Sequence, residues 1–65
     1  MNVIVIIYMK SGNTIRTLFS ADEYTNLLTI FNDPGKILHM HDERKRVITE
    51  RLIPVKNIEY LEVEF

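Results

Sequence analysis

Residues 3–9 read Val3-Ile4-Val5-Ile6-Ile7-Tyr8-Met9, a strand-like run with no polar alternation. A half-buried strand alternates apolar and polar residues, whereas a strand buried on both faces stays apolar throughout. One face of this strand therefore needs the protein's own core. The other face needs a barrel interior, a second layer or another chain. Because a short chain has little left to build a second layer, we expect another chain.

The size of the chain points the same way. Its 65 residues allow one small domain. A domain of about 60 residues buries only ~60% of the surface that its unfolded chain exposes, so it is marginally stable alone. Small domains often gain stability from disulfides, metals or partners, but this chain has no cysteine. Disulfides, thiolate zinc sites and cysteine nucleophiles are therefore excluded.

The sequence also bears on location. The lack of cysteine fits a reducing compartment, so we expect a cytoplasmic protein. The first residues carry neither the basic region nor the cleavage site of a signal peptide. The apolar run is far shorter than the ~20 residues that a helix needs to cross a bilayer, so we expect no membrane association.

A β-hairpin is predicted at the start of the chain. Residues 14–19 form a second strand-like segment, joined to the first by Lys10-Ser11-Gly12-Asn13. Gly12 and Asn13 most easily adopt the positive φ that short hairpin loops need.

The next segment has the pattern of a helix over residues 20–32. Ser20 is a good N-cap, and Glu23 three positions later predicts a capping box. A proline and a glycine follow, and they end the helix near Asn32. Ile30 lies away from the centre of the predicted apolar stripe, which consists of Tyr24, Leu27, Leu28 and Phe31.

A second hairpin is predicted from residues 37–41 and 46–53, with the polar tip Asp42-Glu43-Arg44-Lys45. Pro54 cannot donate a ladder hydrogen bond, so it ends this hairpin or lies on an edge. Residues 58–65 then form the last strand, with apolar side chains on one face and glutamates on the other.

These segments predict an α+β fold of order ββαβββ, in which one helix packs across a small, mainly antiparallel sheet. The first strand is central, and the last strand beside it joins the two halves of the chain. A partly closed five-stranded barrel with a capping helix is the alternative. Met9 and Met40 fill gaps in a core that we expect to contain Val3 or Ile4, Val5, Ile7, Leu18, Leu27, Leu28, Phe31, Leu38, Leu61 and Val63.

Basic residues gather in one part of the chain, although 8 Lys and Arg against 9 Asp and Glu give a net charge of −1. A solvated hairpin tip is the simpler interpretation of this cluster. Aromatic residues for stacking on bases are missing nearby, so nucleic-acid binding is the alternative and a protein partner is favoured. The candidate nucleic-acid contacts are Lys36, Arg44, Lys45, Arg46 and Arg51.

Other chemistry is weakly supported. His39 and His41 share one face of a strand, but a tetrahedral zinc site needs three or four ligands, so we expect no metal site. Ser11 and Ser20 belong to a turn and a cap, and two glycines cannot form a phosphate loop. We expect a protein that is not an enzyme and has no cofactor.

The layout resembles that of short accessory proteins encoded by phages and mobile elements of Gram-positive bacteria. The resemblance rests on the opening strand with its Met9-Lys10-Ser11-Gly12 turn, and on the closing segment Val55-Lys56-Asn57-Ile58-Glu59-Tyr60-Leu61. It implies an accessory protein that binds a host or phage macromolecule as an inhibitor.

The function that these features predict is protein binding. We expect a homo-oligomer that also binds another protein, of unknown identity, through a sheet edge or the outer face of the helix.

Overall fold

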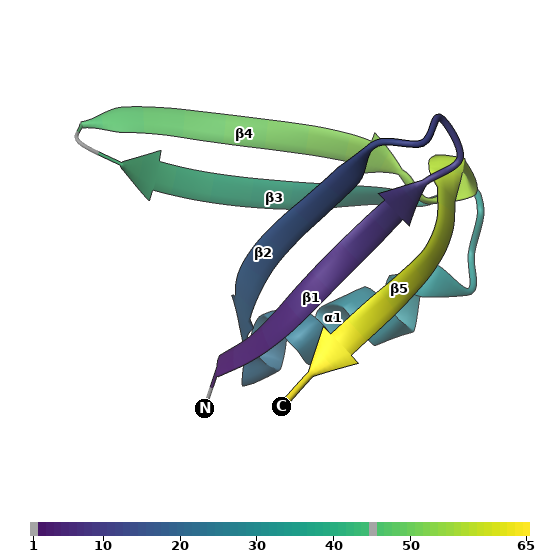
Figure 1. Cartoon of the computed structure of the whole chain (residues 1–65), viewed down its shortest axis with the longest axis horizontal. Helices are drawn as coiled ribbons and strands as arrows, with labels where there is room; N and C mark the ends of the chain where they lie inside the picture. The colour runs from purple at the N-terminus through teal and green to yellow at the C-terminus, as the bar shows by residue number, and fades with distance from the viewer. Residues whose placement is uncertain (1, 45) are drawn as a thin grey trace.

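The computed structural model describes residues 2–44 and 46–65, without the side chains of residues 42–44. It has the α+β order predicted from the sequence (Figure 1). One α-helix, α1 (Ala21–Phe31), and a short 3-10 turn, η1 (Val55–Asn57), accompany five strands: β1 (Asn2–Met9), β2 (Thr14–Ser20), β3 (Ile37–Arg44), β4 (Val47–Pro54) and β5 (Ile58–Glu64).

The strands form two antiparallel sheets instead of one. The first sheet has the order β2-β1-β5, and the second is the β3-β4 hairpin. The prediction that β1 is central and that β5 lies beside it is confirmed. Neither sheet is closed, so the structure is the open α+β arrangement and not the barrel.

The core lies on one face of the three-stranded sheet. Figure 1 shows α1 and the base of the β3-β4 hairpin behind this sheet. From β1 the core takes Val3, Val5 and Ile7, and from the helix it takes Leu27. The other buried side chains of this cluster are Phe19, Leu38, Met40, Ile53 and Ile58. Burial of apolar side chains on this single face therefore holds the helix, the sheet and the hairpin base together.

The helix begins as predicted. The Ser20 side chain accepts a hydrogen bond from the backbone N–H of Glu23, and the Glu23 carboxylate accepts one from the Ser20 N–H. This capping box satisfies two backbone donors, one in the first turn and one at the cap itself. The helix ends at Phe31 with Asn32 as its C-cap, which confirms the predicted end.

The first hairpin has the predicted loop, residues 10–13, between β1 and β2. Met9 donates a backbone hydrogen bond to Asn13 and accepts one from Gly12, and Gly12 has φ +96. These two bonds close the loop, and its glycine lies in the left-handed region. Of Gly12 and Asn13, only the glycine uses the positive φ predicted for both.

Two leucines predicted in the core are exposed instead. Leu18 pairs with Ile4 on the outer face of the sheet and is 59% exposed, whereas its neighbour Phe19 pairs with Val3 and is buried. The pairing with β1 decides which face of β2 is buried, because residues directly opposite each other share a face. Leu28 is 48% exposed. The helix turns Ile30, partly buried, toward the core in its place.

The second hairpin is longer than predicted. Its ladder runs from Ile37↔Pro54 to Arg44↔Val47, so the backbone of residues 42–44 continues β3 instead of forming a polar tip. Among the described side chains of this hairpin, only those at its base contribute to the core. The remainder projects beyond the three-stranded sheet as an arm (Figure 1). Polar residues can continue this strand because the arm extends beyond the core and so does not need an apolar face.

Candidate protein-interaction site

The first candidate surface is the outer face of the three-stranded sheet, opposite the core. The register places side chains on it in three rows across β2, β1 and β5. The rows are Leu18–Ile4–Glu64, Arg16–Ile6–Glu62 and Thr14–Tyr8–Tyr60. The β1 members are only half-buried. No element of the described chain covers this face (Figure 1). Within the described chain the second apolar face of β1 is therefore left uncovered, and its coverage by another chain stays a prediction.

Two tyrosines close one end of this outer face. The rings of Tyr8 and Tyr60 are stacked, with centroids 4.3 Å apart and an interplanar angle of 15°. Partial loss of water around the Tyr8 ring, followed by the negative charge of Glu62, raises the pKa of Tyr8 above its ordinary value. Both effects disfavour the phenolate. The outer face therefore ends in a flat, stacked aromatic pair beside Glu62.

The second candidate surface is the open edge of β2. Met9 and Asn13 form a hydrogen-bonded pair, and such pairs alternate with non-hydrogen-bonded pairs along an antiparallel ladder. The alternation directs the backbone groups of Ile15 and Thr17 toward β1. The N–H and C=O groups of Arg16 and Leu18 therefore point away from the sheet. An open edge of this kind is a template for another strand.

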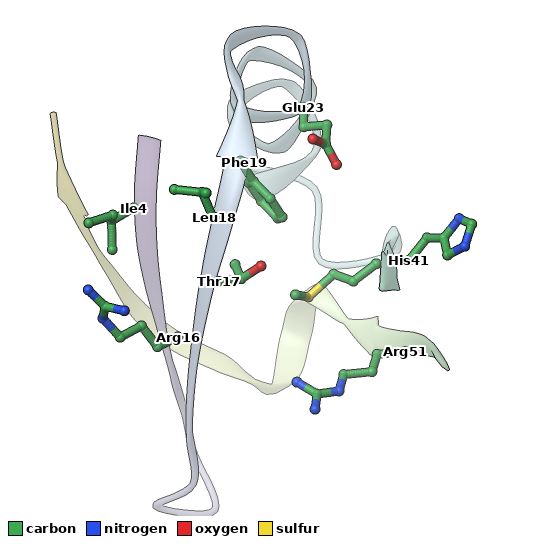
Figure 2. A pocket seen from close by; sticks show the side chains of 9 residues that line it. Ile4, Arg16, Thr17, Leu18, Phe19, Glu23, His41 and Arg51 are labelled. Carbon is green, nitrogen blue, oxygen red and sulfur yellow. The ribbon is translucent and has the colours of Figure 1, made fainter. Parts of the chain in front are cut away.

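A groove runs along this edge. It has a volume of about 410 Å³, and β2 forms its floor while β3 and β4 face it. Figure 2 shows Ile4, Arg16 and Leu18 on one side of β2, and Thr17 and Phe19 on the other. Arg51 lies across the groove from Thr17 (Figure 2), and Met40 also lines the groove. The ring of His41 points away from β2 (Figure 2).

The arrangement suits an extended chain better than a compact ligand. A strand laid along the β2 edge offers alternate side chains to the two sides of β2. One side carries the apolar Ile4 and Leu18 together with Arg16, and the other carries Thr17 and the cationic Arg51. The groove therefore combines unpaired backbone groups with side-chain contacts on both sides.

The predicted nucleic-acid contacts do not gather into one patch. Lys36 is exposed at the hairpin base, in a shallow depression with Lys56, whereas Arg51 lies beside the groove. Arg46 is exposed in the turn at the far end of the arm, with φ 69. At about 3.3 Å per residue the path from Lys36 to Arg46 spans roughly 30 Å. Lys45 and the side chain of Arg44 lie outside the described part of the chain.

The two histidines share a face of the hairpin arm, as their spacing predicted. His39 Nε2 lies 3.7 Å from Glu50 Oε1, and both side chains are more than half exposed. Within residues 2–44 and 46–65, as far as their side chains are described, no group of three or more histidines and carboxylates is placed to hold a metal ion.

Sequence reasoning missed the groove and most of its walls. The sequence shows that Thr17 and Phe19 alternate with Arg16 and Leu18, but it does not show which of these two sets faces the core. The sequence also does not show that β2 has an open edge, because this depends on which strands lie beside β2. Among the residues that line the groove, only Arg51 was predicted from the sequence as a binding contact.

Comparison with protein-family models, curated proteins and solved structures finds no match for this chain. None of the helices in the described residues is both long enough and apolar enough to span a membrane. The geometry of the two surfaces is therefore the basis for the functional assignment.

Proposed function

We propose that the protein is a small non-enzymatic module that binds a partner protein by accepting an extended segment of that partner along β2. The carrying observation is the open β2 edge, with the backbone groups of Arg16 and Leu18 unpaired beside a groove of about 410 Å³. In line with the resemblance to phage and mobile-element accessory proteins, the partner is a host or phage protein that this module inhibits.

Main-chain hydrogen bonds provide the general part of this recognition. An added strand pairs with backbone groups that otherwise bond only to water, which is how sheet edges capture peptides. Because Arg16 and Leu18 are two positions apart, both present their N–H and C=O groups to the same added strand.

Side chains provide the selective part. Arg51 is the cationic side chain on the β3-β4 side of the groove. Glu23 also lines the groove, but its carboxylate accepts the Ser20 N–H. The segment should therefore carry an acidic residue on the side that faces Arg51 and an apolar residue on the side that faces Ile4 and Leu18.

The non-enzymatic assignment rests on the same groove. Thr17, Glu23 and His41 supply a hydroxyl, a carboxylate and an imidazole to its lining, but no side-chain hydrogen bond joins any two of them within the described chain. A nucleophile and its base normally lie within hydrogen-bond reach of each other.

The test uses peptides selected from a random display library against the whole chain. The proposal expects binders with alternating apolar and acidic residues. Their affinity should fall at least about tenfold, a loss of ~1.4 kcal/mol, when a chemically synthesised chain carries an N-methyl group on Leu18. The methyl group removes the outward N–H without interrupting the ladder to β1.

N-methylation of Leu61 is the matched control. The same alternation directs the Leu61 N–H to the opposite open edge of the sheet, on β5. Equal loss of affinity in both synthetic chains, or binders that are indifferent to N-methylation of Leu18, would overturn binding at the β2 edge.

Self-association is a second part of the proposal. Its support is the uncovered outer face, where Leu18 and Tyr60 are 59% and 46% exposed. Covering this face with protein would remove apolar surface from water, which is favourable at about 25 cal/mol per Å².

Nucleic-acid binding is the alternative function, and the exposed Arg46 and Arg51 on the hairpin arm favour it. Phosphate contacts weaken steeply as salt rises. A chain whose binding to DNA or RNA falls with salt, and is lost when Arg46 and Arg51 are both replaced by alanine, would support this alternative over peptide binding.

A further inference from the structure

The outer face has a charge pattern that selects one arrangement of two copies. Its β2 column contains Arg16, and its β5 column contains Glu62 and Glu64. The β1 column between them, Ile4, Ile6 and Tyr8, is uncharged. The face is therefore basic along one edge, acidic along the other and apolar in the middle.

Two sheets that pack face to face in a symmetric dimer are related by a two-fold axis lying between them. An axis parallel to β1 places the β2 column of one copy over the β5 column of the other. Arg16 then meets Glu62 of the partner subunit, and this contact occurs twice. An axis perpendicular to the strands instead places arginine over arginine and glutamate over glutamate.

We propose that the protein forms a face-to-face homodimer about an axis parallel to β1, with Arg16 of each copy paired to Glu62 of the partner subunit. This dimer rests on the self-association proposed above. It specifies that a second copy of the chain covers the outer face, and it specifies how the strands of the two copies are aligned. Like charges placed opposite each other across an interface oppose association, so the alternative axis is disfavoured.

The pairing of Arg16 with Glu62 tolerates the rotation between twisted sheets, because both residues lie in the middle row of the outer face. Packed sheets are typically rotated by about 30° relative to each other. Arg16 and Glu62 belong to the same row as Ile6, the middle residue of the apolar column. A charge one strand, about 4.8 Å, from the centre moves only about 2.5 Å under that rotation, which a long arginine side chain absorbs.

The contact is small, which sets the expected affinity. Three strands about 4.8 Å apart and about six residues long cover roughly 300 Å² of flat area per copy. Stable interfaces bury about 800 Å² per partner. We therefore expect a weak dimer with a dissociation constant on the order of 100 µM.

No ion pair within the described part of the chain competes with this contact. Arg16 and Glu62 lie on opposite sides of Ile6, and no salt bridge joins them among the described side chains. Both side chains are exposed, so replacing them should leave the fold intact.

Analytical ultracentrifugation from about 10 µM to about 1 mM tests the arrangement with reversed charges. Arg16→Glu places two glutamates in each contact, and Glu62→Arg places two arginines there. Each variant alone should dimerise at least about tenfold more weakly than the wild type. An equimolar mixture of the two variants should form a heterodimer, because both of its contacts then join opposite charges.

The Lys56→Glu variant is the control for a change of net charge, because Lys56 is exposed in η1, away from the outer face. It should dimerise like the wild type. Circular dichroism of each variant confirms that the fold is retained.

Two results would overturn the proposal in distinguishable ways. A wild-type chain that stays monomeric to about 1 mM removes self-association altogether. A wild-type chain that dimerises while the mixture of Arg16→Glu and Glu62→Arg shows no recovery keeps self-association but removes this arrangement.

Discussion

Adjacent residues of β2 provide a direct test of the register on which both surfaces depend. Phe19 is 5% exposed in the core, and Leu18 is 59% exposed on the outer face. A shift of one residue in the pairing with β1 would exchange them. Replacing each with alanine therefore measures which of the two side chains the core contains.

The expected effects differ by several-fold. Phe19→Ala should lower the free energy of unfolding by about 3–5 kcal/mol, the usual cost of emptying a buried aromatic site. At 0.05–0.15 kcal/mol per residue the whole domain has about 3–10 kcal/mol of stability, so this variant is at or near the limit of folding. Leu18→Ala should cost about 0.5 kcal/mol, as exposed substitutions usually do.

Urea unfolding followed by circular dichroism measures both values. With a slope of about 1 kcal/mol per molar urea, Phe19→Ala should lower the midpoint by about 3 M or leave no folded baseline, and Leu18→Ala by about 0.5 M. Equal losses, or a larger loss for Leu18→Ala, would refute the register and with it the composition of the outer face and the groove.

Three further predictions concern single sites. Ser20→Ala removes one half of the capping box and should cost about 1 kcal/mol, seen as a fall in Tm of about 4–8 °C; an unchanged Tm would show that the cap contributes nothing. Arg46→Gly relieves a positive φ and should raise Tm by about 3 °C, and a lower Tm would contradict the turn geometry. Because the pKa of Tyr8 is raised in the folded state, stability should fall as pH rises through and above the ordinary tyrosine pKa, since the unfolded chain releases that proton first. Tyr8→Phe should reduce this fall, as measured by urea unfolding at alkaline pH. Glu62→Gln should let Tyr8 ionise at lower pH, as measured by an absorbance titration. If either variant leaves its measurement unchanged, the assigned cause of the raised pKa is contradicted.

The sequence was sufficient for features that depend on local chemistry. The capping box needs only Ser20 and Glu23 at the right spacing, and Pro54 ends its strand because it lacks an N–H. The central place of β1 followed from a run of residues without polar alternation. Each of these is decided within a few residues of the chain.

Features that depend on distant pairing could not be read from the sequence. Leu18 and Phe19 are both good core residues, and only the pairing of β2 with β1 chooses between them. The division into two sheets and the groove between β2 and the second hairpin arise when separate segments meet. The length of β3 was also missed, because polar residues in a projecting arm have no buried face to set a pattern.

Amide hydrogen exchange in β2, measured by NMR, tests the central claim most directly. In the free protein the amides of Arg16 and Leu18 should exchange fast, and those of Ile15 and Thr17 slowly, because only the latter donate to β1. Saturation with a peptide selected for binding should slow exchange at Arg16 and Leu18. Fast exchange that persists at both amides while the peptide is bound would contradict strand addition at the β2 edge.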